Sequence, residues 1–435
     1  MWKHSFNNRL NMKHTIIIAG IAALTLAGCK SAQEEPFWLG ADISWETQME
    51  QRGEKFYNYE GDDEWECTAL MQELGLNAVR LRVWVDPQAW TLQQRELRRQ
   101  MMEAQQAQQG QRPRRPQGGP QPPQGGPQPP QGGPQPPQPQ AEPETPADPH
   151  VGSCDKEDLL VKCLRAKDLG MEIMVDFHYS DNWADPGKQP VPLSWKGHSY
   201  EQMKEDLKAH TVEVLTLLKD NGVEPKWVQV GNETSNGLLW SRKSGRGEGG
   251  MREYEDTIGL ADRCPANYAG FIQAGHEAVK SVFPDCTTIV HLDNGWKPEL
   301  YDWNLGILEE NGVEYDMVGM SLYPYWARSS GREDADQVIT DCIANIKHVY
   351  ERFGKESMIV ETGFEVDESK PEVLEEGRRQ LARVIRESIH DTDGHCKGVF
   401  YWEPECKPRS YKLGAFTAEG RPTVIMEAYK DYENL

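Results

Sequence analysis

The chain has 435 residues, of which 27% are charged and 14 are tryptophan, and its formal net charge at pH 7 is −22. Such an acidic surface repels phosphate polymers, which excludes nucleic acid as an expected partner, whereas a neutral polysaccharide is indifferent to it. The length allows a full hydrophobic core, and the composition is typical of an exported globular enzyme.

The N-terminus carries the pattern of a targeting segment. Basic residues at 13–14 precede the apolar stretch 15–27, which ends in Leu26-Ala-Gly-Cys29. About 13 apolar residues are too few to span a bilayer and are typical of a signal-peptide core. The ending resembles the lipobox of bacterial lipoproteins, which implies removal of residues 1–28 and lipidation of Cys29. We therefore expect an exported lipoprotein at the outer membrane or cell surface, with a periplasmic face or an ordinary secretory signal as alternatives.

The composition changes between residues 93 and 149 to Gln, Pro, Gly and Arg, and Gln-Gly-Gly-Pro-Gln-Pro-Pro occurs three times from Gln117 to Pro137. A segment without apolar side chains cannot form a core, so we predict a disordered, partly polyproline II insertion, preceded by a short helix around 95–106. Helical periodicity resumes at 155–170. The insertion therefore lies in the loop after the second predicted strand, and 29–435 otherwise form one domain. A spacer or docking arm is its alternative role.

Eight short apolar or β-branched runs alternate with helix-length amphipathic segments such as 200–220 and 371–390. The runs lie at 39–44, 77–85, 172–178, 227–231, 287–292, 317–322, 358–360 and 398–402. This alternation predicts a (β/α)₈ TIM barrel of the α/β class. A doubly wound open sheet is the main rival, and the lack of a glycine-rich phosphate loop after the first run disfavours it.

Polar and aromatic side chains follow nearly every run, where a barrel places its active site. Glu233 and Glu361 each end such a run, and two carboxylates from different strands can cleave a glycosidic bond. Aromatic faces pack on the C–H face of a pyranose, while carboxylates, amides and arginine bind its hydroxyls. The candidate substrate-binding residues at these ends are Asp42, Arg82, His178, Trp183, Asn232, Asp293, Tyr323, Trp326 and Trp402.

Several of these segments together resemble a known family. They are Gly40-Ala-Asp-Ile-Ser44, Arg80-Leu-Arg-Val-Trp-Val85, the run from Asp176 to Gln189, Gly231-Asn-Glu233, Ser321-Leu-Tyr-Pro-Tyr-Trp326 and Val360-Glu-Thr362. They look like glycoside hydrolase family 53, the endo-β-1,4-galactanases, and the resemblance covers 36–429 without the insertion.

That resemblance implies an activity and a set of roles. The activity would be endo-cleavage of β-1,4-galactan, including the type I arabinogalactan side chains of pectin. Glu233 would be the acid/base and Glu361 the nucleophile. The resemblance also implies that Arg82, His178, Asn232, Tyr323 and Trp402 surround the −1 sugar.

The expected mechanism is retaining, with the two carboxyl groups about 5 to 5.5 Å apart. Arg82 and a hydrogen bond from Tyr323 are expected to favour the charged form of Glu361. A second carboxylate and partial burial are expected to raise the pKa of Glu233 so that it holds its proton near neutrality.

The chemistry requires no metal or other cofactor. Bacterial members of the family often carry a calcium loop after the nucleophile strand, but 363–370 do not match it, and 391–395 favour a plain turn over a structural calcium site. Among the cysteines, Cys396 and Cys406 are the only pair for which we expect a disulfide.

The protein is expected to be a monomer that meets the membrane only through its lipid. Two other functions stay open. One is a related retaining hydrolase acting on another β-1,4-glycan such as mannan or xylan, and the other is a non-catalytic surface lipoprotein that binds glycans.

Overall fold

The computed structural model describes residues 36–61, 63–110, 153–242 and 253–434. The chain divides into two compact units, Met1–Pro36 and Phe37–Leu435, and the second carries the fold described below. The predicted signal peptide at 1–28, Cys29 and the proline-rich repeats at 117–137 lie outside the described residues.

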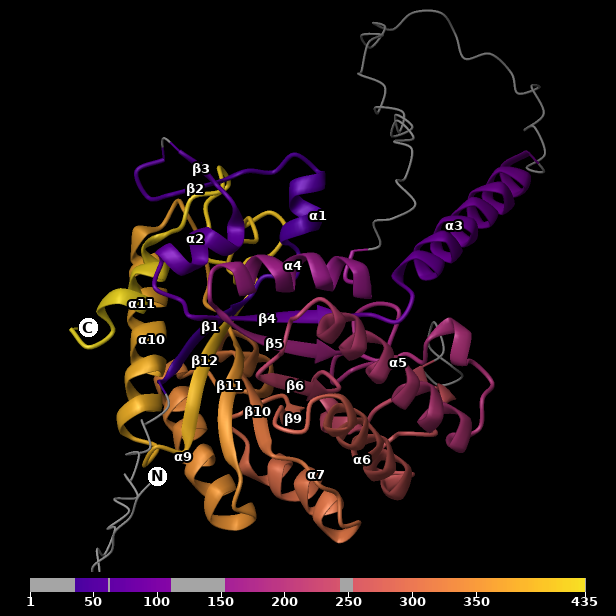
Figure 1. The fold of residues 1–435 in the computed structure, drawn as a ribbon. Coiled ribbons are helices and arrows are strands. Elements are labelled where there is room, and N and C mark those ends of the chain that lie inside the picture. Colours follow the sequence, from indigo (N-terminus) through magenta and orange to yellow (C-terminus); the bar gives the residue numbers. More distant parts are fainter. Residues whose placement is uncertain (1–35, 62, 111–152, 243–252, 435) are drawn as a thin grey trace, which may run out of the picture. The chain divides into compact units, whose positions relative to one another are not determined.

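Eight parallel strands close into a barrel (Figure 1). In chain order they are β1 (Trp38–Asp42), β4 (Ala78–Val83), β5 (Glu172–Phe177), β6 (Trp227–Val230), β9 (Thr287–Leu292), β10 (Met317–Leu322), β11 (Glu356–Thr362) and β12 (Cys396–Trp402). Each of these strands pairs with the one before it and the one after it in this order, and β1 pairs with β12 to close the barrel. The predicted TIM barrel is therefore confirmed, and every predicted run overlaps one of its strands.

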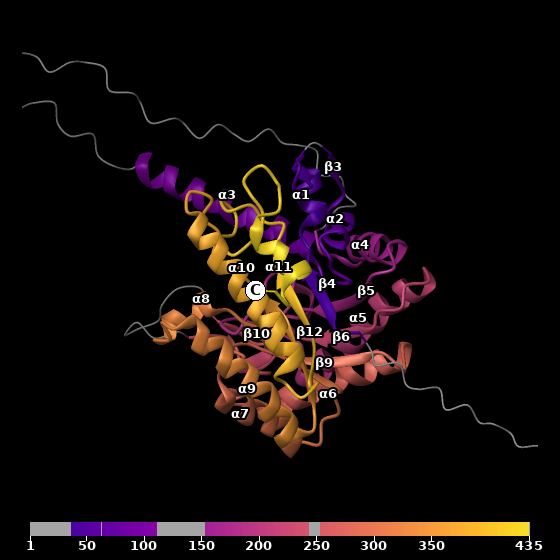
Figure 2. The same cartoon turned by 90° about the vertical axis from the view of Figure 1, so that its left-hand side faces the viewer.

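Helices cover the strands, and α9 packs against β11 and α10 against β12, in front of the barrel in Figure 2. They are α1 (Glu46–Gln51), α2 (Cys67–Glu73), α3 (Pro87–Gly110), α4 (Lys156–Asp168), α5 (Tyr200–Asp220), α6 (Pro265–Val282), α7 (Pro298–Glu310), α8 (Pro324–Ala327), α9 (Ala335–Phe353), α10 (Pro371–His390) and α11 (Ala428–Asp431). Two short antiparallel sheets of two strands each lie in the loops. One pairs β2 (Phe56–Tyr57) with β3 (Glu64–Trp65), and the other pairs β7 (Ser241–Arg242) with β8 (Tyr254–Asp256).

The inside of the barrel is apolar near the amino ends of the strands and polar near their carboxyl ends. The apolar half is a separate cluster made of Trp38, Ala78, Met174, Trp227, Ile289, Met317, Met358, Val360 and Phe400. Gly40 makes room for this cluster, because a Cβ at that position would lie 2.3 Å from the Phe400 ring. The polar half is formed by buried side chains farther along the same strands, and it is the floor of the site described below.

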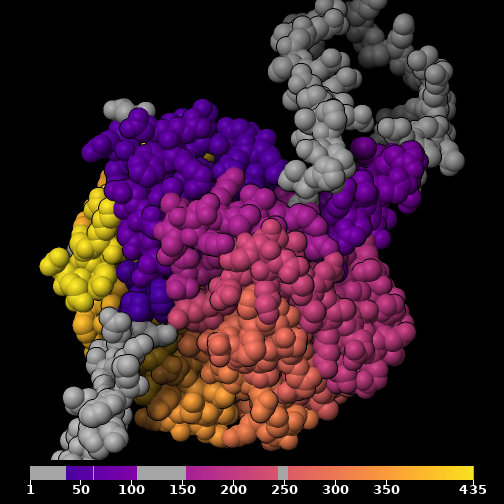
Figure 3. Space-filling view, viewed as in Figure 1, coloured from indigo at the N-terminus to yellow at the C-terminus, as the bar shows by residue number. Residues whose placement is uncertain are grey.

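The first and last segments of the barrel unit lie against each other, as the indigo and yellow atoms show (Figure 3). Tyr429 Oη donates a hydrogen bond of 3.1 Å to the carbonyl oxygen of Gly40, and Tyr57 N donates one of 2.9 Å to the carbonyl oxygen of Gly420. These contacts reinforce the closure made by β1 and β12.

The predicted insertion leaves the barrel after β4 and returns before α4. Its first part is helical, since α3 continues to Gly110 and is longer than the short helix expected around 95–106. The two flanks are tied to the barrel, because Trp84 N donates to the carbonyl oxygen of Cys154 at 2.8 Å and Val85 N donates to that of Ser180 at 2.9 Å.

The expected disulfide between Cys396 and Cys406 is wrong, because both thiols are free and buried. Cys396 begins the seven-residue strand β12 and Cys406 follows its far end. An extended strand of that length separates its ends by about 20 Å, well beyond the reach of a disulfide. Within the described residues, no helix combines the length and apolar character needed to cross a bilayer.

Candidate active site

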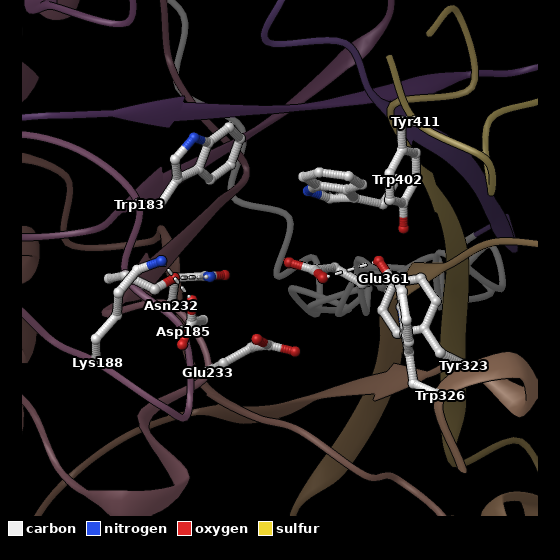
Figure 4. Close-up of a pocket in the computed structure, with 11 residues that line it drawn as sticks. Trp183, Asp185, Lys188, Asn232, Glu233, Tyr323, Trp326, Glu361, Trp402 and Tyr411 are labelled. Atoms are coloured by element: carbon white, nitrogen blue, oxygen red, sulfur yellow. Dashed lines mark hydrogen bonds and ion pairs between the residues drawn. The ribbon is translucent and has the colours of Figure 1, made fainter. Parts of the chain in front are cut away.

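A pocket of about 250 Å³ opens at the carboxyl ends of the barrel strands. Its lining consists of Trp183, Ala184, Asp185, Lys188, Asn232, Glu233, Tyr323, Trp326, Glu361, Trp402 and Tyr411. The carboxyl groups of Glu233 and Glu361 point toward each other in the middle of this pocket, with the indoles of Trp183 and Trp402 along one side (Figure 4). The strands β6 and β11 deliver these two carboxyl groups, as the sequence predicts.

Glu361 is held by one cation and one hydroxyl. Arg80 Nη2 lies 3.0 Å from Glu361 Oε1, and Tyr323 Oη donates a 3.0 Å hydrogen bond to Glu361 Oε2. Burial raises the pKa of Glu361 to about 7, while the Arg80 guanidinium and the Tyr323 hydroxyl act in the opposite direction. Both contacts stabilise the carboxylate form, which is the form a nucleophile needs.

Glu233 has different neighbours from Glu361. Ser321 Oγ donates a 2.7 Å hydrogen bond to its Oε1. Burial raises the pKa of Glu233 well above its ordinary value, and the negative charges of Glu361 and Asp293 raise it further. No cation contacts Glu233 among the described ion pairs, so of the two carboxyl groups Glu361 ionises first and Glu233 keeps its proton.

The backbone at the rim of this pocket turns through an unusual conformation. Tyr179, Glu233, Asn294 and Glu403 follow β5, β6, β9 and β12, and their φ angles are 49°, 47°, 48° and 50°. Side chains other than glycine rarely adopt this left-handed region, and each such residue costs of order 1 kcal/mol or more. The turn carries Glu233 from the end of β6 into the pocket.

A sequence model of one protein family matches residues 38–113 and 138–428, which is most of the chain. The chain belongs to glycosyl hydrolase family 53. The match omits 114–137, which contain all three proline-rich repeats, and so agrees with an insertion into a family 53 barrel.

Two of three similar proteins are named as endo-β-1,4-galactanases. This family 53 chain is 30% identical over 275 residues to a probable arabinogalactan endo-β-1,4-galactanase A of Aspergillus terreus, covering 59% of this chain and 72% of that protein. It is 25% identical over 409 residues to an endo-β-1,4-galactanase of Bacillus subtilis, covering 90% and 75%. An uncharacterised protein of Niallia circulans is 28% identical over 398 residues, covering 86% of each chain.

Two solved structures share the fold of this family 53 chain. A structure of fungal β-1,4-galactanases matches with a TM-score of 0.66 at 20% identity, covering 91% of this chain and 99% of that one. The family 53 catalytic domain of Ignisphaera aggregans matches with a TM-score of 0.65 at 22% identity, covering 92% and 97%.

The structure brings most of the predicted site residues of this family 53 barrel to the pocket. Besides the two glutamates, the pocket is lined by Trp183, Asn232, Tyr323, Trp326 and Trp402. Asp293 does not line it, but its charge acts on Glu233. Asp42, Arg82 and His178 are buried beneath it, at 0%, 0% and 2% exposure.

The expected contact between Arg82 and Glu361 is wrong, because Arg80 makes it instead. Both arginines point into the barrel from β4, but the Arg82 guanidinium pairs with Glu403 and lies 3.5 Å from Asp42 Oδ1. It is covered by indoles, and its carbon Cζ lies 4.2, 5.4 and 5.5 Å from the ring centres of Trp183, Trp45 and Trp84.

These three indoles and that of Trp402 form a cluster beside the pocket, which we call the tryptophan wall: Trp45, Trp84, Trp183 and Trp402. Neighbouring rings in the wall have centroids 5.4 to 6.1 Å apart and mostly meet edge to face. Only Trp183 and Trp402 line the pocket, and Arg82 lies behind them. Arg82 therefore acts on the pocket through the tryptophan wall.

Sequence reasoning did not select several residues of the site. Arg80 lies in the same motif as Arg82, and the spacing of two residues shows that both side chains share one face of the strand. The sequence does not show how deep in the barrel each guanidinium lies. Ser321 and His291 also end strands, yet serine and histidine at such positions are common in cores. Tyr411 follows β12 in a loop with no distinguishing pattern.

One group of described side chains has the composition of a metal site. Ligand atoms of Glu403, Glu405 and Cys406 lie within 4.8 Å of one another and are buried. The Arg82 guanidinium already pairs with Glu403, so a positive charge stands where a metal ion would be needed. The segment 391–395 forms a turn in which His395 N donates to the carbonyl oxygen of Thr392 at 3.0 Å.

Proposed function

We propose that this glycoside hydrolase cleaves β-1,4-galactosidic bonds within galactan and within the type I arabinogalactan side chains of pectin, with retention of configuration. The observation that carries the proposal is the pair Glu233 and Glu361. They face each other in one pocket, and burial raises the pKa of both, but Arg80 and Tyr323 oppose this effect at Glu361, so that Glu361 ionises first. Two carboxyl groups with this division of roles are what a retaining glycosidase requires.

In the first step the Glu361 carboxylate attacks C1 of the sugar while Glu233 gives its proton to the leaving glycosidic oxygen. The C1–O bond breaks as the bond from Glu361 to C1 forms, which leaves a galactosyl-enzyme. Esterification removes the negative charge of Glu361, and the pKa of Glu233 falls as a result.

In the second step Glu233, now a carboxylate, removes a proton from water. The water oxygen bonds to C1 as Glu361 leaves as a carboxylate, and both side chains return to their first state. Acid, base and nucleophile are all protein side chains, so these steps need no cofactor.

The choice of galactan is supported by the names of the relatives, whereas the residue types at the pocket would also suit other β-1,4-glycans. The exposed ring of Trp326, at 45% of its surface, and the ring of Trp402 offer two aromatic platforms at the same opening. Aromatic platforms at an open pocket suit a chain that enters and leaves, which supports endo action.

The test is product analysis on linear β-1,4-galactan, mannan and xylan with the soluble enzyme, which lacks residues 1–29. Wild type is expected to release short galacto-oligosaccharides, and Glu361→Gln is expected to lose at least about a thousandfold in rate because the nucleophile is gone. Cleavage of mannan or xylan alone would keep the mechanism and replace the substrate. Equal binding without cleavage by both proteins would favour a glycan-binding lipoprotein instead.

We further propose that the protein is lipidated at Cys29 and works as a monomer at the outer membrane or cell surface. Support comes from Leu26-Ala-Gly-Cys29 after an apolar stretch. Mass spectrometry of the full-length protein from membranes is expected to find an acylated N-terminal Cys29, and Cys29→Ala should release the enzyme into the soluble fraction. A soluble, unacylated wild-type protein would contradict the proposal.

A further inference from the structure

A chain of hydrogen bonds reaches Glu233 from the interior of the barrel. His291, on β9, is completely buried, and its Nε2 lies 2.9 Å from Ser321 Oγ on β10. Ser321 Oγ in turn lies 2.7 Å from Glu233 Oε1. The direction in which each hydrogen points along this chain depends on which ring nitrogen of His291 carries the proton.

The other ring nitrogen, Nδ1, is approached by two N–H groups. Glu233 N donates to it at 3.2 Å, and Gln229 Nε2 lies 3.0 Å away. The orientation of the Gln229 amide is fixed independently, because its oxygen accepts from Arg80 Nε at 2.6 Å and arginine can only donate. The Gln229 amino group therefore faces His291.

One acceptor is also close, since Asn232 Oδ1 lies 3.0 Å from Nδ1. That oxygen already accepts from Arg80 Nη2 at 2.7 Å. A hydrogen on Nδ1 would point at two other N–H groups and leave the backbone N–H of Glu233 without its acceptor. Because two N–H donors approach Nδ1 and the one nearby acceptor is already occupied, Nδ1 is the unprotonated nitrogen of His291.

We propose that His291 and Ser321 form a relay that keeps the catalytic proton of Glu233 on Oε2. His291 Nε2–H donates to Ser321 Oγ, whose own hydrogen then has Glu233 Oε1 as its acceptor among the described side chains. An oxygen that accepts this bond acts as the carbonyl oxygen of a neutral carboxyl group, so the proton is carried by the other oxygen. His291 and Ser321 are thus positioning residues for the acid/base, and the inference rests on the proposed glycosidase function.

The proton balance of the reaction follows from this placement. Glu233 Oε2 gives its proton to the glycosidic oxygen when the C1–O bond breaks, and Oε2 takes a proton back from water in the second step. Oε1 keeps its bond from Ser321 throughout. The relay itself transfers no proton, since the buried imidazole stays neutral: burial and the charge of Arg80 lower the pKa of His291 well below its ordinary value.

Other charged groups face this chain and are kept constant in the test. Glu361, Asp293 and Asp185 raise the pKa of Glu233, and the Ser321 hydrogen bond lowers it. Around His291, Arg80 and His178 lower its pKa and Asp176 raises it.

The first experiment determines the tautomer of His291 directly by ¹⁵N-edited NMR of the imidazoles in the wild-type enzyme, assigned with His291→Gln. The expected result is a neutral ring with its hydrogen on Nε2 at every pH at which the enzyme is active. A hydrogen on Nδ1 would overturn the proposal, because Ser321 would then donate to His291 and not to Glu233. This readout is independent of whether galactan is the substrate.

The second experiment measures the pH dependence of kcat/KM for Ser321→Ala. Loss of the Ser321 hydrogen bond is expected to move the alkaline limb, which reports Glu233, to higher pH. The rate on galactan should fall about tenfold or more, while a dinitrophenyl galactoside, whose leaving group needs little protonation, should lose less than about threefold. Equal losses on both substrates with an unmoved limb would show a merely structural role.

The matched control is Ser357→Ala, since Ser357 is also a buried strand serine but its hydroxyl has no hydrogen-bond partner among the described residues. It should leave the alkaline limb in place. His291→Gln can still present an amino group toward Ser321, whereas His291→Asn is too short to do so. The Gln variant should therefore keep the limb nearer wild type than the Asn variant, and the reverse order would contradict the relay.

Discussion

Tyr323 is a single side chain whose hydroxyl decides part of the charge on the nucleophile. Its 3.0 Å hydrogen bond to Glu361 Oε2 lowers the pKa of that carboxyl group and opposes the effect of burial. In Tyr323→Phe the pKa of Glu361 should rise. Because Glu361 must be ionised to attack, the acid limb of kcat/KM should move to higher pH, by about one unit for a bond worth roughly 1.5 kcal/mol.

Kinetics on galactan between about pH 4 and 9 measure this shift. The range begins at the ordinary pKa of a carboxyl group and extends beyond the raised pKa of Glu361. The alkaline limb should stay in place, since Ser321 and not Tyr323 contacts Glu233. A lower plateau with both limbs unmoved would mean that Tyr323 binds sugar but does not tune the nucleophile.

At the residue scale, the sequence allows the two glutamates to be predicted because each ends an apolar run. It does not separate Arg80 from Arg82. Both point to the same side of β4, and only the depth of the barrel and the position of Glu403 determine that Arg80 reaches Glu361 while Arg82 does not. A spacing of two residues fixes the side of a strand and not the reach of a long side chain.

The tryptophan wall is a feature of several elements, because its rings come from the ends of β1, β4, β5 and β12 and Arg82 lies behind them. Arg82→Lys keeps the charge but loses the planar guanidinium that packs on Trp183. We expect KM for galactan to rise several-fold, in line with a cation–π contact worth about 1 kcal/mol, with a smaller change in kcat.

Steady-state kinetics and tryptophan emission check this prediction together. The emission should shift because three indoles border the guanidinium. A fall in kcat with an unchanged KM would place Arg82 in the chemistry and contradict its role behind the tryptophan wall.

The loop after β12 buries a second carboxyl pair. Glu405 is 0% exposed, and its carboxyl group lies beside that of Glu403. Burial, and then the charge of Glu403, raise the pKa of Glu405 well above its ordinary value. Glu405 therefore keeps its proton to a higher pH in the folded enzyme than in the unfolded chain, where it ionises above about pH 4.3.

It follows that Glu405 costs stability as the pH rises. Below about pH 4 both states hold the proton, and above it the folded state loses up to about 1.4 kcal/mol per pH unit until its own pKa is reached. Glu405→Gln should therefore unfold at a higher urea concentration than wild type at pH 7.5 and at a similar one at pH 4. Glu372→Gln, at an exposed position on α10, is the control. An equal effect at both pH values would contradict the prediction.

Element types and boundaries follow well from the sequence. The runs at 287–292 and 317–322 and the helices at 200–220 and 371–390 agree with the structure to the residue, because periodicity and flanking turn residues mark them. The run at 358–360 is too short a prediction for β11, since polar Glu356, Ser357, Glu361 and Thr362 continue the strand. Polar residues at the carboxyl end of a barrel strand belong to the active site, so a search for apolar runs ends before it reaches them.

For the whole molecule, the insertion after β4 is expected to be dispensable for folding. Its flanks are already tied to the barrel at Trp84 and Val85, and the family match omits 114–137. Shortening a loop whose two ends are already held together changes the free-energy cost of closing it by less than about 1 kcal/mol. Deletion of 114–137 should leave the unfolding free energy and kcat/KM on soluble galactan close to wild type.

Urea unfolding and kinetics of the deletion variant test this expectation, with the full-length soluble enzyme as control. Loss of cooperative unfolding would mean that the repeats pack on the barrel. A normal enzyme in solution that works poorly on cells would favour the alternative role of the segment as a docking arm.

The left-handed turns at Tyr179, Glu233, Asn294 and Glu403 have a consequence for how such an enzyme changes under selection. Strain at these four positions is concentrated on the catalytic side of the molecule, so substitutions that relieve it raise heat resistance while they displace the acid/base or its neighbours. A screen for thermal tolerance alone would therefore collect inactive variants at this rim first. Durable and active variants should instead come from changes among the outer helices, away from the ends of β5, β6, β9 and β12.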